Sequence, residues 1–499
     1  MTKSLFHPRC RAWIEVVFDG RGAPNSKAFH LEIDPRSATV GLNGHYEADT
    51  WTMEFDARQL PFDPDQVAYC AVRIYMWDSA KNLDQPEWAV DDNLMIKGLV
   101  DEVQTNLVGE DNIVSFTGRD YTAILDPEWN PKDKVKANGG DLREVVESIA
   151  DEAAPEGTTA KFEVVWEGED DPPIVGGLAR STKKKGLWVK PGKTYWDVIW
   201  DLCIQHAYVP RVEGSTIYIS EPATQTRRTL LQAPRLIYGS TLEKLEVKRT
   251  FAREKVPQIV IVAYDPYEKK KIEVKYPAKR NIDVMTTAEK EQSKDALGIK
   301  LTVKKDEQMF FPGPAGVIDK DALLRYARMK FYHIGRGETV YSMSTRHLSI
   351  PAPRSHATIT DNVKALGEAF GLYKRNEDEI NLLSLRPGSA IGIEFDPWNR
   401  DHLRRMEVGQ RVDYILQLGY HQEIANFVAN NIDRMDFFKQ DYYYNRGEIS
   451  YSVDDGIEIE IEAANFASEV REINFAESAA AGSSVPNVSR QSTDGLVPR

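Results

Sequence analysis

The stretch NIVSFTGRDYTAILD, residues 112–126, predicts a strand that turns into a short helix. Apolar residues alternate along the strand, which is expected to stop at Gly118, and apolar residues then follow at helical spacing from Tyr121. Arg119 and Asp120 lie side by side at the break. This charged pair has two interpretations: an active site, or a glycine bend followed by an Asp that caps the helix.

The chain on either side of this stretch is rich in predicted strands. Runs of β-branched and aromatic residues, separated by Gly, Pro, Asn or Asp, occur at residues 11–18, 28–33, 49–55, 71–77, 94–107 and 112–117. Strands at this spacing predict a small antiparallel barrel or sandwich. A polar stretch with two prolines and two glycines, residues 126–141, ends it, so a first domain is expected over 1–130.

Residues 131–234 predict an α+β accessory domain made of helices and a hairpin. Asp141 is the expected N-cap of one amphipathic helix, and Thr194 is the expected N-cap of a second. The hairpin follows at residues 208–220 and turns at Glu213-Gly214.

Strands return over 235–470, which we predict to be a second β-rich domain. Its order of strands echoes that of the first domain, and two related barrels in one chain would explain the echo. Two segments exceed what a second barrel needs, and we expect insertions around 278–334 and 411–438. The fold class expected is therefore mainly β, with α+β accessory domains.

The last predicted element is a hairpin at residues 442–466, ending at Phe466. Its isoleucines alternate strictly with glutamates over residues 457–462, and Asp455-Gly456 marks the turn. The isoleucines should face a core, and the glutamates should face water or a channel. Residues 471–499 are expected to form a flexible tail. The final Leu-Val-Pro-Arg matches the residues before the cut of a common thrombin site and is left out of the fold prediction.

Charge argues against a protein whose main task is to hold phosphates. The net charge is −14 over 499 residues, with a sequence pI near 5.3. Basic runs occur at residues 181–186 and 268–275, but neither contains interleaved aromatic residues that could stack on bases. Solvated strand ends are therefore favoured over DNA-binding patches.

The three cysteines, Cys10, Cys70 and Cys203, show neither a disulfide pattern nor a metal-binding spacing, so folding in a reducing compartment is expected. The N-terminus lacks the apolar core of a signal peptide, and no apolar run approaches the length of a membrane span. The sequence predicts synthesis in a cytosol and no membrane segment.

No motif for catalysis, metal binding or cofactor binding was found. The nine histidines are scattered singly, the glycine-rich residues 335–340 lack the Lys-Ser or Lys-Thr of a phosphate loop, and no nucleophile motif occurs. We therefore expect no catalytic residue, no cofactor and no metal.

Two alternatives from other classes remain. Numerous carboxylate pairs, such as those in residues 167–172, would suit a cell-wall-degrading enzyme. The tyrosine run Tyr442–Tyr444 could stack on sugar rings in a carbohydrate-binding adhesin, although three successive tyrosines must point to both faces of a strand.

The order of these motifs resembles a known family. GHYEADTWTMEF (44–55), IVSFTGRDYTAILD (113–126), GKTYWDVIWDLCIQHAYVPRVEGSTIYIS (192–220), LEKLEVKRTFAREKVPQIVIVAYD (242–265) and DDGIEIEIEAANF (454–466) follow one another as in tailed-phage baseplate or tail hub proteins. This group includes proteins like late control protein D and the hub part of type VI secretion spikes. The resemblance covers most of residues 10–466.

The resemblance implies two tail-tube-like antiparallel β-barrels and a structural, non-enzymatic role. Three copies would form a pseudo-sixfold ring that joins a sixfold tail tube to a threefold spike. The ring would enclose the channel through which DNA leaves without specific binding, and an acidic lining would keep phosphates from adhering. Implied partners are further copies of the chain, the tail tube or a distal tail or initiator protein, the central spike, other baseplate subunits and a tape-measure protein. The chain would lie in the virion tail after synthesis in the host bacterial cytoplasm.

The resemblance favours the structural interpretation of the opening stretch. Gly118 and Asp120 would turn the last barrel strand into a capping helix, and Arg119 is a candidate for an ion pair across a domain or subunit boundary. With Asp455, Gly456 and Phe466, these residues are expected to be landmarks of the fold.

Overall fold

A computed structural model gives the fold of the chain. It describes residues 8–18, 29–44, 46–78, 89–108, 111–129, 140–153, 162–168, 171–173, 192–221, 234–239, 241–249, 258–265, 269–278, 308–313, 320–334, 339–351, 379–394, 400–432 and 439–464. Phe466, the predicted tail, the basic run at residues 181–186 and much of the first predicted insertion lie outside these residues.

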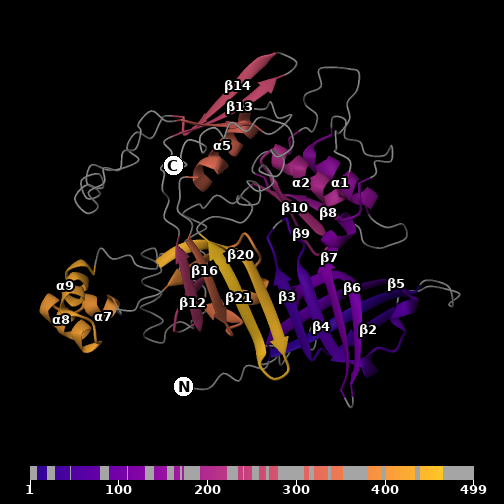
Figure 1. The fold of residues 1–499 in the computed structure, drawn as a ribbon, viewed down its shortest axis with the longest axis horizontal. Helices are drawn as coiled ribbons and strands as arrows, with labels where there is room; N and C mark the ends of the chain where they lie inside the picture. The colour runs from indigo at the N-terminus through magenta and orange to yellow at the C-terminus, as the bar shows by residue number, and fades with distance from the viewer. Residues whose placement is uncertain are drawn as a thin grey trace, which may run out of the picture.

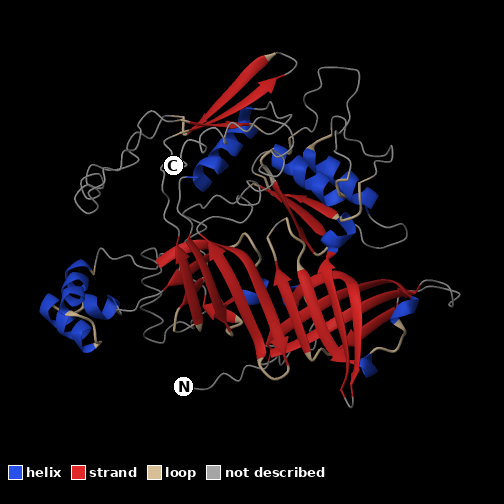
Figure 2. Ribbon diagram, viewed as in Figure 1, coloured by secondary structure: helices blue, strands red, loops and turns tan. Residues whose placement is uncertain are grey.

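One large sheet of thirteen strands dominates the molecule (Figures 1 and 2). Its strand order is β12 (Lys244–Arg249), β16 (Thr339–Thr345), β21 (Gly456–Ala464), β20 (Lys439–Ser452), β3 (Ser37–Leu42), β4 (Thr50–Asp56), β7 (Asp111–Asp120), β6 (Leu94–Val108), β5 (Val67–Asp78), β1 (Pro8–Phe18) and β2 (Phe29–Ile33). Strand β19 (Ala390–Glu394) also pairs with β20, and β11 (Arg235–Ile237) pairs with β19. The pairs along the main order are antiparallel, and the prediction of a mainly β fold is confirmed.

The two predicted barrels do not appear as closed rings among the described strands. Instead, β20 from the C-terminal part pairs with β3 from the N-terminal part, with Ile449 opposite Val40 and Tyr451 opposite Ala38. The apolar faces of both parts belong to one buried cluster, which includes Ile14, Phe116 and Ile459. Strand β3 was not predicted from the sequence, because its Ala and Gly residues have low β propensity and it contains only two β-branched residues.

Gly118 has a different role from the one expected. The strand does not stop there but continues to Asp120, as part of β7. A Cβ atom on Gly118 would lie 1.9 Å from the Leu99 carbonyl oxygen and 2.7 Å from Cζ2 of Trp51. The buried Trp51 ring also lies against Gly98, where a Cβ atom would lie 2.8 Å from the indole nitrogen. Gly118 therefore permits close packing within a continuous strand, which is a common use of strand glycines.

The terminal hairpin of β20 and β21 matches its predicted pattern. Ile457, Ile459 and Ile461 are buried, whereas the intervening glutamates are wholly or partly exposed. The strands turn at residues 453–455, and Gly456 follows with a φ of +83°, which favours glycine. Asp455 donates its backbone N–H to the Ser452 hydroxyl at 2.8 Å.

Two smaller α+β units lie beside the sheet and share a second buried cluster. The first contains α1 (Leu142–Ala153), α2 (Tyr195–Gln205) and a sheet in the order β8 (Glu163–Trp166), β10 (Thr216–Ser220) and β9 (Val209–Glu213). The second contains α5 (Lys320–Ile334) and a sheet in the order β14 (Lys270–Tyr276), β13 (Ile259–Asp265) and β15 (Met309–Pro312). Helix α5 and strand β15 thus belong to a packed unit.

The remaining elements are short. The segment 400–431 forms α7 (Arg400–Arg404), α8 (Val408–Gln417) and α9 (Gln422–Asn431), which have a small core of their own. The 3₁₀ helices are η1 (Ala57–Gln59), η2 (Pro64–Gln66), η3 (Asp91–Asn93), η4 (Tyr121–Leu125) and η5 (Leu382–Ser384), and β17 (Ser349–Pro351) pairs with β18 (Glu379–Asn381). Across the described segments, no helix has the length and apolarity that a membrane crossing requires.

The contacts of Gly118 predict the effect of adding one methyl group. Gly118→Ala should lower the free energy of unfolding by at least about 2 kcal/mol, because the Cβ atom would push against a strand carbonyl. Denaturant unfolding followed by tryptophan fluorescence measures this. Gly409→Ala on α8, where a Cβ atom would meet nothing within 4 Å, is the control and should be neutral or stabilising. Equal stability of the two variants would contradict this packing role.

Candidate functional site

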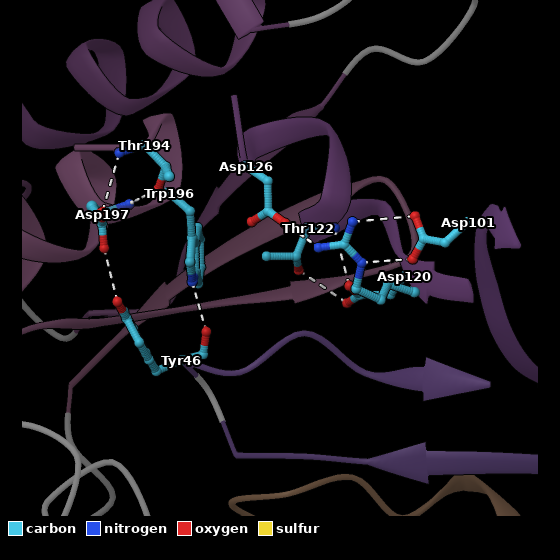
Figure 3. Close-up of polar contacts among 9 residues, drawn as sticks. Tyr46, Asp101, Asp120, Thr122, Asp126, Thr194, Trp196 and Asp197 are labelled. Atoms are coloured by element: carbon cyan, nitrogen blue, oxygen red, sulfur yellow. Dashed lines mark hydrogen bonds and ion pairs between the residues drawn. The ribbon is translucent and has the colours of Figure 1, made fainter. Parts of the chain in front are cut away.

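Three segments meet where the large sheet contacts the unit containing α1 and α2 (Figure 3). They are the loop of residues 43–49 between β3 and β4, the turn from β7 into η4, and the N-terminus of α2. We call these three segments the joint. Each comes from one of the motifs that carry the family resemblance, although they are far apart along the chain.

Asp120 caps η4. Its carboxylate accepts the Thr122 backbone N–H at 3.1 Å and the Thr122 hydroxyl at 3.1 Å. Because Asp120 is only 4% exposed, both bonds form away from bulk water. The turn from strand to helix thus depends on this carboxylate.

Arg119 is held by two carboxylates. Its guanidinium donates to Asp101 from Nε at 2.7 Å and from Nη2 at 3.1 Å, and from Nη1 to Asp126. Asp101 is where the pairing of β6 with β7 shifts register, so the bulge directs its side chain at Arg119. These hydrogen bonds to carboxylates raise the pKa of Arg119. Both partners lie within residues 1–130, so the ion pairs seen here lie inside the predicted first domain.

Tyr46 connects the loop to α2. Its hydroxyl donates to Asp197 Oδ1 at 2.8 Å, its carbonyl accepts the indole N–H of Trp196 at 2.8 Å, and its ring packs edge-on against Trp200 with centroids 5.0 Å apart. Burial and the hydrogen bond to Asp197 raise the pKa of Tyr46. The phenol therefore stays a donor at neutral pH.

The Asp197 carboxylate has a second task. Thr194 and Asp197 form a capping box at the start of α2, with Asp197 N–H donating to Thr194 Oγ1 at 3.0 Å and Thr194 N–H donating to Asp197 Oδ2 at 3.1 Å. One carboxylate oxygen thus caps the helix while the other receives Tyr46. The Thr194 cap was predicted from the sequence. The hydrogen bond between Tyr46 and Asp197 was not predicted, because it joins residues 151 positions apart.

A second contact places the hairpin of β9 and β10 on the sheet. Lys97 of β6 donates to the Ser215 hydroxyl at 3.2 Å and lies 5.0 Å from the centre of the Tyr121 ring. Arg211 of β9 forms ion pairs with Glu167 and Glu213, at 2.7 Å and 2.8 Å. The hairpin is therefore bonded directly to the sheet through Lys97 and Ser215.

Beneath the joint, two carboxylates share a polar cleft. Asp49 accepts the Asn43 backbone N–H at 2.7 Å, and its own carbonyl accepts the backbone N–H of Asp120 at 2.9 Å. Burial raises the pKa of Asp49 to about 7 and that of Asp120 well above its usual range, where the Asp49 charge adds to the effect. The cleft also contains Glu47, Arg211, Glu213 and Arg386.

Arg386 brings the C-terminal half of the chain to this cleft. It donates to the carbonyl oxygens of Leu383 and Leu385 next to η5, and to that of Leu94 at the start of β6, at 2.8–3.0 Å. Its positive charge opposes the raised pKa of Asp49. Arg386 thus links both halves of the chain, and no sequence motif indicated it.

The cleft is too small for a substrate. It has a volume of about 30 Å³, which is room for water only. Among the residues that the structure describes, no group of three or more His, Cys, Asp or Glu side chains could hold a metal ion. Arg211 pairs with Glu213, Arg386 donates to backbone carbonyl oxygens, and Glu47 pairs with Arg446 outside the cleft.

The tyrosine run considered for sugar stacking is buried. Tyr442, Tyr443 and Tyr444 are 1%, 6% and 1% exposed, and the Tyr442 hydroxyl lies 2.5 Å from that of Tyr341. The hypothesis that these rings stack on sugars at the surface is wrong, because all three are buried, and Tyr442 and Tyr444 belong to the core of the large sheet.

The Arg386 contacts predict that this side chain stabilises the union of the two halves. Arg386→Met should lower the free energy of unfolding by about 2 kcal/mol, because it removes the hydrogen bonds to β6 and the positive charge that favours the ionised Asp49. Arg346→Met, which removes an exposed side chain with salt bridges no closer than 4.0 Å, should change it by less than about 0.5 kcal/mol. An equal loss of unfolding free energy in both variants would contradict the stabilising role of Arg386.

The raised pKa of Asp49 predicts that Asp49→Asn stabilises the protein, and that this stabilisation increases with pH. An unfolded Asp ionises near pH 3.9, whereas Asp49 in the native protein does so near 7. The native state therefore loses stability as pH rises between these values, and Asp49→Asn escapes this loss. The melting temperature of the variant minus that of the native chain should be larger at pH 8 than at pH 5, by at least about 2 °C. The exposed Asp454→Asn is the control, and a difference independent of pH for Asp49→Asn would overturn the expectation.

Comparisons with known proteins were made by family, by sequence and by structure. No family model and no curated protein sequence matches the chain. Several solved structures match the chain. A tail protein from Neisseria meningitidis is 12% identical with a TM-score of 0.46, over 91% of this chain and 96% of its own. A 43 kDa tail protein of prophage MuSo2 from Shewanella oneidensis is 10% identical with a TM-score of 0.48, over 93% of this chain and 99% of its own. A prophage tail protein from Listeria monocytogenes is 10% identical with a TM-score of 0.42, over 94% and 98%. Each of these three matches spans more than nine-tenths of this chain, at low sequence identity.

Proposed function

We propose that the protein is a structural hub of a phage tail or a related injection machine, and not an enzyme. Three copies would form a pseudo-sixfold ring that joins a sixfold tail tube to a threefold spike and encloses the DNA exit channel. The chain would reside in the virion tail or baseplate. The observation that carries the proposal is the continuous sheet formed by both halves of the chain, whose main strand order ends in the edge strands β12 and β2.

Both edge strands leave apolar surface uncovered on the core side of the sheet. Phe29 on β2 lies opposite the buried Val16 and is 42% exposed, and Val247 on β12 lies opposite the buried Tyr341 and is 38% exposed. Among the described strands, β2 and β12 each pair on one side only. An edge strand with an apolar side chain is a surface for pairing with another chain. Since the two edges differ, copies would join head to tail, and such contacts form a ring where the rotation between copies closes.

The other face of the sheet has the chemistry of a channel wall. On the central strands β21, β20, β3, β4 and β7, cross-strand partners place the following residues on this face: Glu458, Glu460, Glu462, Glu448, Ser450, Ser37, Thr39, Thr52, Glu54, Ser115 and Thr117. Arg446 and Arg119 lie on the same face, and each forms an ion pair with a carboxylate. Hydroxyls and carboxylates dominate, and carboxylates repel phosphates. Such a face would let DNA pass without binding it.

The joint would fix the accessory unit to the ring. Tyr46, Asp197 and Arg119 tie α2 and the β7–η4 turn to the sheet through direct bonds. We propose domains over 1–130, 131–234 and 235–470, followed by a flexible tail over 471–499. In the ring, the two halves of the sheet would form the tube-like barrels. Segments around 278–334 and 411–438 would decorate the outside. Tube, spike, other baseplate and tape-measure proteins are the proposed partners.

The native mass, measured by light scattering, tests this function. A trimer is expected for the native chain, and Phe29→Asp or Val247→Asp should shift the mass to that of a monomer, because a charge at either edge opposes apolar contact. Val453→Asp changes a valine that is 65% exposed in the β20–β21 turn and should remain trimeric. A native monomer or dimer, or edge variants that stay trimeric, would overturn the proposal.

A further inference from the structure

The sheet of β14, β13 and β15 presents an aromatic and basic face on the side away from α5. Ile259, Ile261 and Phe311 point toward α5 and belong to the shared core. Since successive strand residues alternate between faces, Tyr264 of β13 and Phe310 of β15 point the other way. They are 61% and 53% exposed.

Strand β14 adds positive charge to the same face. Lys271 lies directly opposite Tyr264, and Lys275 lies opposite Val260, whose other neighbour is Phe310. Glu273 lies between the two lysines and bridges to them at 3.2 Å and 3.0 Å. Exposed bridges of this kind are weak, so the ammonium groups can exchange one anion for another.

This arrangement supplies what the basic run at residues 268–275 lacks in the sequence. There, no aromatic residue is interleaved with the lysines, whereas the folded sheet brings Tyr264 and Phe310 onto their face from other strands. The two rings are about 13 Å apart along the strand direction, since Tyr264 is four residues beyond the partner of Phe310.

We propose that this face, defined by Tyr264, Phe310, Lys271 and Lys275, binds single-stranded nucleic acid. Flat aromatic rings stack on unpaired bases of any sequence, and flanking lysines neutralise the phosphates. Duplex DNA hides its base faces and offers only charge. An acidic polypeptide without aromatic residues, such as polyglutamate, also offers only charge, so neither uses both features of this surface.

Fluorescence anisotropy with a labelled oligothymidine of about 12 nucleotides, at low salt, tests the proposal on the full chain. Tyr264→Ala and Phe310→Ala should each weaken binding about tenfold, because each removes a stacking platform. Phe427→Ala on α9 removes a ring that is 60% exposed and should leave the affinity unchanged.

Charge is tested with a matched pair of lysines. Replacing Lys271 and Lys275 with Gln should reduce the slope of log affinity against log salt by about 1.4. Lys244 and Lys248 on β12 have the same Lys-x-Glu-x-Lys spacing, but their partners across the strand are Ser344 and Val340. Replacing these two with Gln should leave binding and slope unchanged.

Three results would overturn the proposal: no binding by the native chain, equal binding by the aromatic variants, or equal competition by duplex DNA or polyglutamate. The last would mean that the face recognises charge alone. The outcome is independent of the native mass, so it stands or fails separately from the hub function.

Discussion

The antiparallel pairing of β3 with β20 is the contact on which the architecture depends. Six ladder partners, from Leu42–Gly447 to Ser37–Ser452, connect residues more than 400 positions apart. Through them the N-terminal and C-terminal strands form one sheet with one apolar core. Because the main strand order is not closed among the described strands, β2 and β12 remain as edges at its ends. The proposed assembly follows from these edges.

The joint shows why a charged pair at a strand-to-helix turn need not be catalytic. Arg119 is neutralised by Asp101 and Asp126, and Asp120 is committed to capping η4. Tyr46 and Asp197 are also fully used in structural bonds. The Tyr46 hydroxyl donates to Asp197, and the other oxygen of Asp197 accepts the Thr194 N–H at the start of α2. A polar contact of this kind fixes orientation, because its hydrogen bonds are directional and an unpaired buried group is costly.

Local patterns in the sequence predicted the elements that local chemistry decides. The isoleucine–glutamate alternation gave the burial of β21, and Thr194 correctly marked the start of α2. Long-range contacts were not predictable in this way. Strand β3 has weak propensity and is stabilised by its neighbours, and Gly118 is required by Trp51, which is 67 positions away. Arg386, Tyr46 and the aromatic neighbours of Lys271 belong to the same class, since only the folded chain brings them to their partners.

The central claim is that the sheet of one copy continues into the next through β2 and β12. Cross-linking with a short bifunctional maleimide tests it most directly, using a chain that carries both Phe29→Cys and Val247→Cys. The account predicts covalent species that end at the trimer, and no cross-linking when either cysteine is present alone. Cross-links confined to dimers, or none at all in the native oligomer, would contradict it.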